Sequence, residues 1–296
     1  MRTPLIGTIV LTLFIAETSY AQKYPIRLSS PDHVGQKNWI SLSGSRHQEV
    51  SVSQNGQLIK SQMTNMLVIF EGREEILTLD GKGLPVRESF TVEKFAKTED
   101  GISTVLLKPG SMILTDGGQE ETKQIVLKGG VLDEDSRDAF AMLMPPHTPD
   151  SLSDDDIYGT KEPRGVGDSW TINKAAAVAD LKDVMIIPVE RMTGTSSIVS
   201  RDNFGGDECL NMLTEVKADG VSLKNGPAGF GAGQGTLQMV FRGCIPIRSG
   251  AISRKESGEV STQYRLKGMP GSPAAGVTMD MTLNQKVDMV VLPPKP

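Results

Sequence analysis

Turn-forming dipeptides divide this chain into short segments, at intervals of roughly eight to fifteen residues over long stretches. Asn55-Gly56 is the strongest hairpin signal, and Asp100-Gly101 and Asp219-Gly220 are further turns of the same kind. Between the turns, apolar and polar residues alternate, most clearly from Val277 to Leu283. Alternation of this kind is typical of half-buried antiparallel strands. The sequence therefore predicts a mainly β protein built from antiparallel meanders.

The composition is that of a globular protein without an obvious polyanion-binding surface. Of 296 residues, 38% are hydrophobic and 23% are charged, and the net charge is −5. Such a chain can form a core, and it has no strong basic field to hold nucleic acid or an anionic membrane. Three histidines and two cysteines are too few for a Cys/His zinc framework.

Residues 1–21 have the pattern of a secretory signal peptide. Arg2 precedes an apolar run of about a dozen residues, and small residues occupy Ser19 and Ala21, where signal peptidase reads the chain. The alternative, a retained membrane anchor, needs about twenty apolar residues, and Glu17 ends the run earlier. We expect cleavage near Ala21 and a soluble periplasmic or extracellular protein without an integral membrane span.

The mature chain is expected to consist of two β-rich parts. The first covers residues 22–146 and includes a short helix at 133–144, which opens with acidic residues and is stopped by prolines. A polar linker at 147–165 leads to the second part, residues 166–296. We expect two antiparallel meander lobes with curved, half-barrel-like sheets. A single β-sandwich or a partly closed barrel is the alternative.

Both parts begin with a Val-Gly turn followed by a tryptophan. Gly35 precedes Trp39, and Gly167 precedes Trp170. Glycine permits a tight turn, and an indole covers the end of a sheet core. The two starts indicate either an internal duplication or a chance match of two short motifs.

The segment Val166-Gly167-Asp168-Ser169-Trp170, after a linker and a short helix, resembles a pattern in uncharacterised secreted bacterial proteins, some of them two-lobed and β-rich. The resemblance covers residues 133–170. Its Val-Gly-Asp-x-Trp motif contains no known catalytic residue, so the resemblance implies a β-rich exported fold and says nothing about function.

Cys209 and Cys244 are the only cysteines, and in an exported chain they predict a disulfide. The two would lie close together if the strands 209–216 and 237–244 were antiparallel neighbours. If residues 221–223 formed a strand between those two, the cysteines would instead be buried free thiols.

No catalytic motif is present in the sequence. A G-x-S-x-G elbow and an H-E-x-x-H motif are both missing, and we expect His33, His47 and His147 at the surface. Asp150, Asp154 and Asp156 are weak candidates for a cation site, although a solvated acidic linker explains them as well. Phe230, in the glycine-rich loop 226–235, is a weak candidate for ligand contact.

These observations favour a non-enzymatic binding or carrier module for a hydrophobic or lipid-like ligand, without a cofactor. Methionines in the strand patterns suit an adaptable apolar pocket as well as a core. The first alternative is a structural or interaction component of the cell envelope, whose partner would be another protein. The second is a hydrolase with a dispersed pair of carboxylates, which would require a concave pocket lined by two acids.

Overall fold

The computed structural model describes residues 22–29, 32–117, 124–145, 152–248 and 250–294. The expected signal peptide lies outside these residues. Thirteen strands and three short α-helices are found in the described chain. The strands are β1 (Lys37–Gln54), β2 (Gln57–Leu79), β3 (Pro85–Glu99), β4 (Ile102–Leu107), β5 (Met112–Asp116), β6 (Gln124–Leu127), β7 (Ser169–Thr171), β8 (Met185–Ile186), β9 (Met192–Phe204), β10 (Asp207–Leu223), β11 (Gln234–Pro246), β12 (Arg254–Lys267) and β13 (Val277–Leu292). The helices are α1 (Glu134–Leu143), α2 (Asp154–Ile157) and α3 (Lys174–Asp180).

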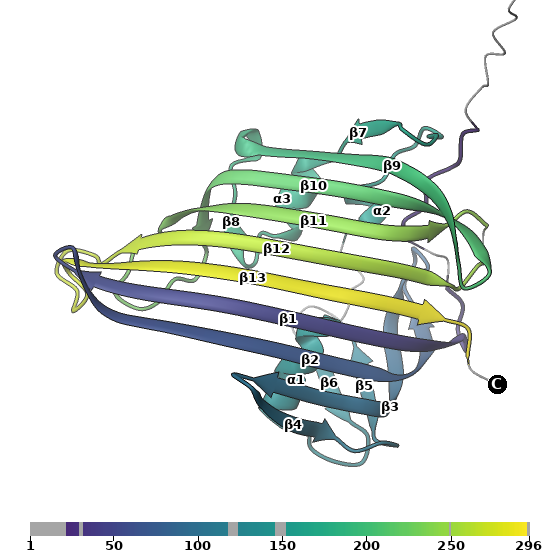
Figure 1. The fold of residues 1–296 in the computed structure, drawn as a ribbon, viewed down its shortest axis with the longest axis horizontal. Helices are drawn as coiled ribbons and strands as arrows, with labels where there is room; N and C mark the ends of the chain where they lie inside the picture. Colours follow the sequence, from purple (N-terminus) through teal and green to yellow (C-terminus); the bar gives the residue numbers. More distant parts are fainter. Residues whose placement is uncertain (1–21, 30–31, 118–123, 146–151, 249, 295–296) are drawn as a thin grey trace, which may run out of the picture.

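All strands belong to one continuous antiparallel sheet (Figure 1). Its order is β6-β5-β3-β2-β1-β13-β12-β11-β10-β9-β7, with β4 on β3 and β8 on β10, and it is open between β6 and β7. The first long strand pairs with the last one, from Trp39 opposite Leu292 to Gln54 opposite Val277. The predicted mainly β, antiparallel fold is confirmed. Two separate lobes are not observed, because this pairing joins both halves of the chain into one sheet.

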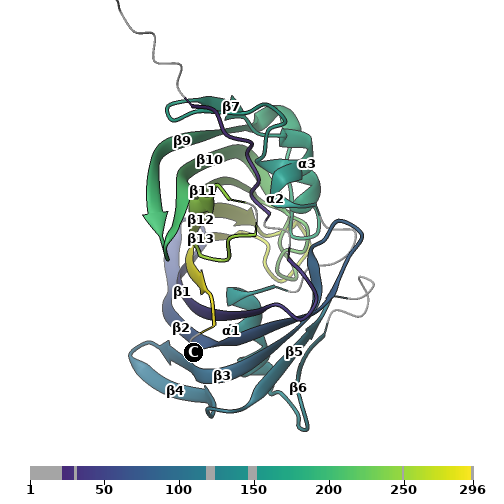
Figure 2. The same cartoon turned by 90° about the vertical axis from the view of Figure 1, so that its right-hand side faces the viewer.

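The sheet is curved, and the helices lie on its concave side (Figure 2). On the β1–β6 half, α1 brings Phe140 against Phe70, Phe90 and Phe95, with ring centroids 5.2–6.0 Å apart in edge-to-face geometry. On the other half, α2 and α3 contribute to a second cluster that includes Met192, Leu237 and Leu266. Each half of the concave face therefore has its own apolar filling.

A glycine in the middle of β1 lets α1 approach the sheet. A Cβ atom on Gly44 would lie 2.6 Å from Leu143 Cδ2 and 2.7 Å from Met142 Cε. The absence of a side chain allows the last turn of α1 to sit directly on the strand. Leu143 is thereby held where it can line the space between the two halves.

Several expected boundaries are corrected by the structure. Glu71-Gly72, a dipeptide with turn-forming composition, continues β2 opposite a bulge at Glu93 of β3, and a Cβ on Gly72 would meet the Thr91 carbonyl oxygen at 2.4 Å. The predicted linker contains α2, which is capped by Ser153 and buries Ile157. Residues 221–223 are the end of β10 itself and do not form a separate strand.

The two Val-Gly turns have equivalent backbone bonds. Gly35 and Gly167 have φ angles of 83° and 90°, and their N–H groups donate to the carbonyl oxygens of Ile76 and Ile198, each at 2.8 Å. The residue after each glycine accepts from the same isoleucine at 3.0 Å. Trp170 is buried. The turns thus start both halves alike, and the duplication itself stays a prediction.

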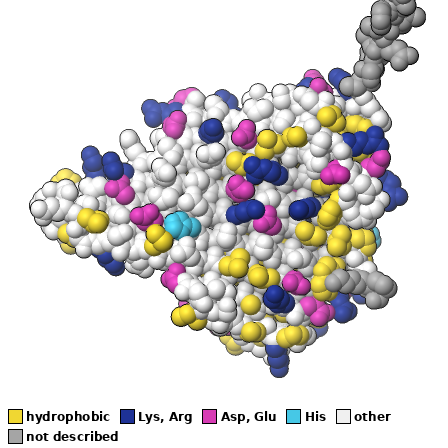
Figure 3. Space-filling model, viewed as in Figure 1, with side chains coloured by type: hydrophobic (Ala, Val, Ile, Leu, Met, Phe, Trp, Pro, Cys, Tyr) yellow, Lys and Arg dark blue, Asp and Glu magenta, His cyan; other side chains and the backbone are white. Residues whose placement is uncertain are grey.

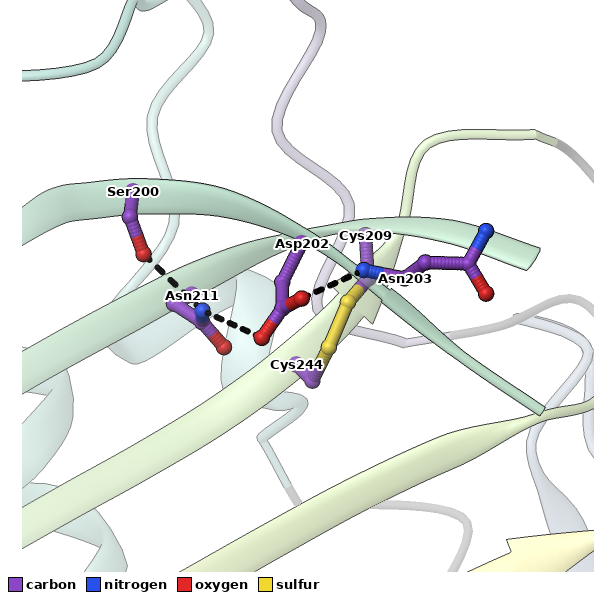
Figure 4. The surroundings of a disulfide bond; sticks show 6 residues. All are labelled: Ser200, Asp202, Asn203, Cys209, Asn211 and Cys244. Carbon is purple, nitrogen blue, oxygen red and sulfur yellow. Dashed lines mark hydrogen bonds between the residues drawn. A yellow bond between two sulfur atoms is a disulfide. The ribbon is translucent and has the colours of Figure 1, made fainter. Parts of the chain in front are cut away.

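The predicted disulfide between Cys209 and Cys244 is present and links β10 to β11 (Figure 4). Asn211 lies opposite Cys244 and Cys209 lies opposite Pro246, so the cysteines are diagonal neighbours with a Cα–Cα distance of 5.3 Å. This distance is within the range that a disulfide spans. A disulfide is also consistent with the expected export.

Replacing both cysteines with alanine is expected to lower the free energy of unfolding by about 3 kcal/mol, because the bond closes a loop of 35 residues in sequence separation. Urea unfolding at neutral pH measures the change. Reduction of the unmodified protein should produce a similar loss, and an unchanged urea midpoint in both experiments would contradict the assignment of a stabilising role.

Candidate functional site: a cleft between the two halves

A cleft opens on the concave side, where the end of α1, the start of α2, residues 22–29 and the central strands meet. Two adjoining cavities form it, with volumes of about 250 and 380 Å³. The cavities share the following lining residues: Leu28, Leu143, Asp154, Glu256 and Met289. The cleft is therefore one continuous space with two chemically different ends.

The smaller cavity is predominantly apolar. Met212, Phe241 and Val287 line it from β10, β11 and β13, and the Tyr158 ring packs against Phe241 in a tilted arrangement, with ring centroids 5.1 Å apart. Side chains alternate between the faces of a strand, so these residues point to the concave side while Lys286 and Asp288 leave from the other face of β13. Apolar walls with a few polar groups are typical of small-molecule sites.

The larger cavity is charged. Its ionisable lining residues are Asp32, Glu74, Glu88, Asp154, Arg254 and Glu256. The five carboxyl groups come from both halves of the chain and surround a single guanidinium group. The Arg254 Nε atom is buried, lies 3.6 Å from Glu256 Oε1 and has no hydrogen-bond partner. The charged end is therefore rich in acceptors and poor in donors.

Neighbouring strands hold the two central carboxyl groups. Glu74 on β2 is opposite Asn38 on β1, and the Asn38 Nδ2 donates to Glu74 Oε2 at 2.5 Å. Glu88 on β3 is opposite Thr115 on β5, whose hydroxyl donates to Glu88 Oε2 at 3.4 Å. Glu74 is 5% exposed. Strand register thus fixes both acids, and polar neighbours partly satisfy them.

The environment shifts the acids toward their protonated forms. Burial, followed by the neighbouring Glu74 carboxyl, raises the pKa of Glu88 to about 8. Burial also raises the pKa of Glu74 and of Asp32. Asp154 lies exposed at the mouth of the cleft, where desolvation by the surrounding protein and the charge of Glu256 raise its pKa to about 6. Glu88 therefore holds its proton near neutral pH.

The raised pKa of Glu88 makes stability depend on pH in a definite direction. Between its ordinary value of 4.5 and about 8, the folded protein binds more protons than the unfolded chain, so the free energy of unfolding falls as pH rises through this window. We expect a higher urea midpoint at pH 5 than at pH 8.5. Glu88→Gln should reduce the difference, whereas Glu75→Gln on the same sheet should not; an equal pH dependence in both variants would contradict the account.

The residues singled out in the sequence are only partly in this cleft. Asp154 lines it, whereas Asp156 caps α2 through Ser153 and contacts Lys82, and Asp150 lies outside the described residues. Phe230 lines none of the described cavities and packs against the second core cluster. In the described chain, no group of three or more His, Cys, Asp or Glu residues is placed to hold a metal ion.

The histidines lie away from the cleft. His33 is exposed, and His147 is outside the described residues. The Nδ1 of His47 is 2.7 Å from Asn65 Oδ1 at a hollow of about 550 Å³, lined mainly by residues of the opposite, convex face. That face mixes charges of both signs with apolar side chains (Figure 3).

Sequence reasoning missed the central residues of the charged end. Glu74 and Arg254 come from segments 180 positions apart, and only the β1–β13 pairing brings them together. A local signal did exist for one of them. Glu74 lies between Gly72 and Ile76 at alternate, inward positions of β2, where a charged side chain is unexpected.

Comparisons with known proteins identify no family. No family model matches the chain, and no curated protein matches it. A solved structure of the outer membrane protein OprG from Pseudomonas aeruginosa aligns with 90% of this chain and 100% of its own, at 5% identity and a TM-score of 0.19. Similarity at that level does not establish a shared fold. None of the described helices has the length and apolar character needed to cross a membrane.

Proposed function

We propose that this protein is an exported binding module that holds a small amphiphilic molecule in the cleft. The apolar part of the ligand would lie against Met212, Phe241 and Val287, and its polar head would point toward Glu74 and Glu88. The observation that carries the proposal is the direct junction of an apolar and a charged cavity on the concave side. The charged cavity, with about 380 Å³, falls within the range of small-molecule pockets, about 300–1,000 Å³, and the apolar cavity adds about 250 Å³ beside it.

The charges favour a cationic head group. Five carboxyl groups face one guanidinium group. The positive charge of an amine that enters the charged end would compensate these carboxylates in place of the protons that they bind. An anionic head would meet Arg254 and also the surrounding carboxylates. A hydrophobic or lipid-like ligand with an amine therefore fits the cleft better than a fatty acid.

The fluorescent amine dansylcadaverine is a suitable probe, because it combines an apolar ring system with a primary amine. We expect saturable binding with an increase in fluorescence, and weaker binding of the anionic probe ANS. Val287→Phe should weaken dansylcadaverine binding at least tenfold, because the larger ring fills the apolar cavity.

Lys286→Phe is the matched control, since it places the same ring on the other face of β13. It should leave the affinity within about twofold of the unmodified protein. Equal loss of affinity in both variants would contradict the proposal. So would the absence of binding at millimolar dansylcadaverine.

A hydrolase is the second candidate, and the pairing of Glu74 with Glu88 favours it. Two carboxyl groups in one cavity are the requirement for general acid–base hydrolysis of glycosidic bonds. Binding remains the better-supported function, because Asn38 and Thr115 already engage these two acids.

The hydrolase candidate predicts turnover that depends on both acids. Release of p-nitrophenol from a panel of p-nitrophenyl glycosides and esters would support it, provided that Glu74→Gln and Glu88→Gln each reduce the rate at least a hundredfold. Glu75→Gln is the control. Turnover that survives both substitutions would assign the activity elsewhere.

A further inference from the structure

The part of β2 nearest its hairpin turn has a neighbour on one side only. β2 begins at Gln57, but its pairing with β3 begins at Met66, which lies opposite Glu99. Residues 57–65 pair with β1 and have no strand on their other side in the described chain. Figure 1 shows β3 and β4 ending well short of the hairpin tip, so no strand of the described chain covers this edge.

The backbone groups along this edge point outward in a regular order. The Asn65 carbonyl accepts from the Asp100 N–H at 2.9 Å, and the Asn65 N–H donates to Asp100 Oδ1 at 2.9 Å, so both groups of Asn65 face away from β1. Because direction alternates along a strand, the N–H and C=O groups of Met63 and Ser61 face the same way. They have no strand partner among the described residues.

The side chains along this edge lack the usual protection against pairing. Leu58, Ile59 and Met63 are 64%, 58% and 56% exposed. Lys60 is the only charged residue from 57 to 65, and no proline occurs there. Long, exposed, apolar strand edges are ordinarily blocked by charge, proline or a covering element, and otherwise pair with another chain.

We propose that this open edge of β2 binds an extended segment of another polypeptide by β-strand addition. The occupant would continue the line of β3, in the space between the hairpin tip at Asn55-Gly56 and the turn at Asp100-Gly101. Six to eight residues fill that length, at roughly 3.3 Å per residue. An acidic side chain beside Lys60 and apolar side chains at alternate positions complement the edge.

A second copy of this chain fits the edge less well. Antiparallel pairing of two β2 strands about Gln62 would place the second copy's hairpin tip opposite Val68 and Ile69, where β3 already pairs with β2. Two lysines would also enter a short interface without an acid to pair with. A short segment of a different protein, with a free end or in a loop, meets neither obstacle.

A labelled peptide tests the proposal with the full mature chain. The probe is a fluorescein-labelled decapeptide that alternates valine and glutamate, and the comparison peptide alternates valine and lysine. We expect fluorescence anisotropy to show saturable binding of the glutamate peptide and at least tenfold weaker binding of the lysine peptide. Lys60→Glu should reverse this preference, because it inverts the only charge on the edge.

The dependence on a backbone N–H separates strand addition from side-chain contact. Ser61→Pro removes an outward N–H without removing a bond to β1, and should weaken binding at least tenfold; Ser61→Ala, the matched control, should not. Should Ser61→Pro fail to fold, the same question is answered by methylating alternate peptide nitrogens, which should also abolish binding.

Three results would overturn the proposal. The first is equal binding by Ser61→Pro and the unmodified protein. The second is no binding of either peptide at millimolar concentration. The third is a concentration-dependent dimer in sedimentation velocity that Ser61→Pro dissolves, which would assign the edge to a second copy. Binding of dansylcadaverine in the cleft is independent of all three outcomes.

Discussion

The pairing of β1 with β13 is the interaction on which the rest of this structure depends. It joins strands from the two ends of the described chain over sixteen residue pairs, from Trp39 opposite Leu292 to Gln54 opposite Val277. Closing so long a loop costs more chain entropy than any hairpin in the sheet, so the pairing must be supported by the packing that follows it. Without it, Arg254 on β12 and Glu74 on β2 would belong to separate sheets. The cleft between the halves is a product of this one contact.

The two halves of the concave side are filled by different helices. α1 fills one half with Phe140 and Leu143, and α2 with α3 fills the other through Ile157 and Ala177. Neither filling extends fully to the central strands, so space remains where they approach each other. The inward residues of β11 to β13 in that space therefore include Glu256 beside Met289, a combination that a closed core would exclude.

The sequence predicted those parts of the fold that local chemistry determines. The turn at Asn55-Gly56, the acidic start of α1 and the disulfide all depend on residues near each other in sequence or on the rarity of a residue type. The single sheet could not be predicted, because alternation indicates that a strand exists and not which strand pairs with it. Glu71-Gly72 shows the same limit within one strand. The dipeptide has turn chemistry, yet it continues β2, and its glycine permits the close approach of the Thr91 carbonyl oxygen next to the bulge at Glu93 of β3.

Unequal strand lengths connect the cleft to the open edge. β2 has 23 residues and β3 has 15. Because β2 pairs with β1 along most of its length, it extends beyond the end of β3 on its other side. The C-terminal part of β2 is covered, because Glu74 and Ile76 pair with β3 and face the filled concave side. At the other end, neither β3 nor a helix of the described chain covers it, and Ser61 and Met63 have outward backbone groups without a strand partner among the described residues. Shortening the β1–β2 hairpin would remove the open edge and leave Glu74 in place, so the two features are physically separable although one strand carries both.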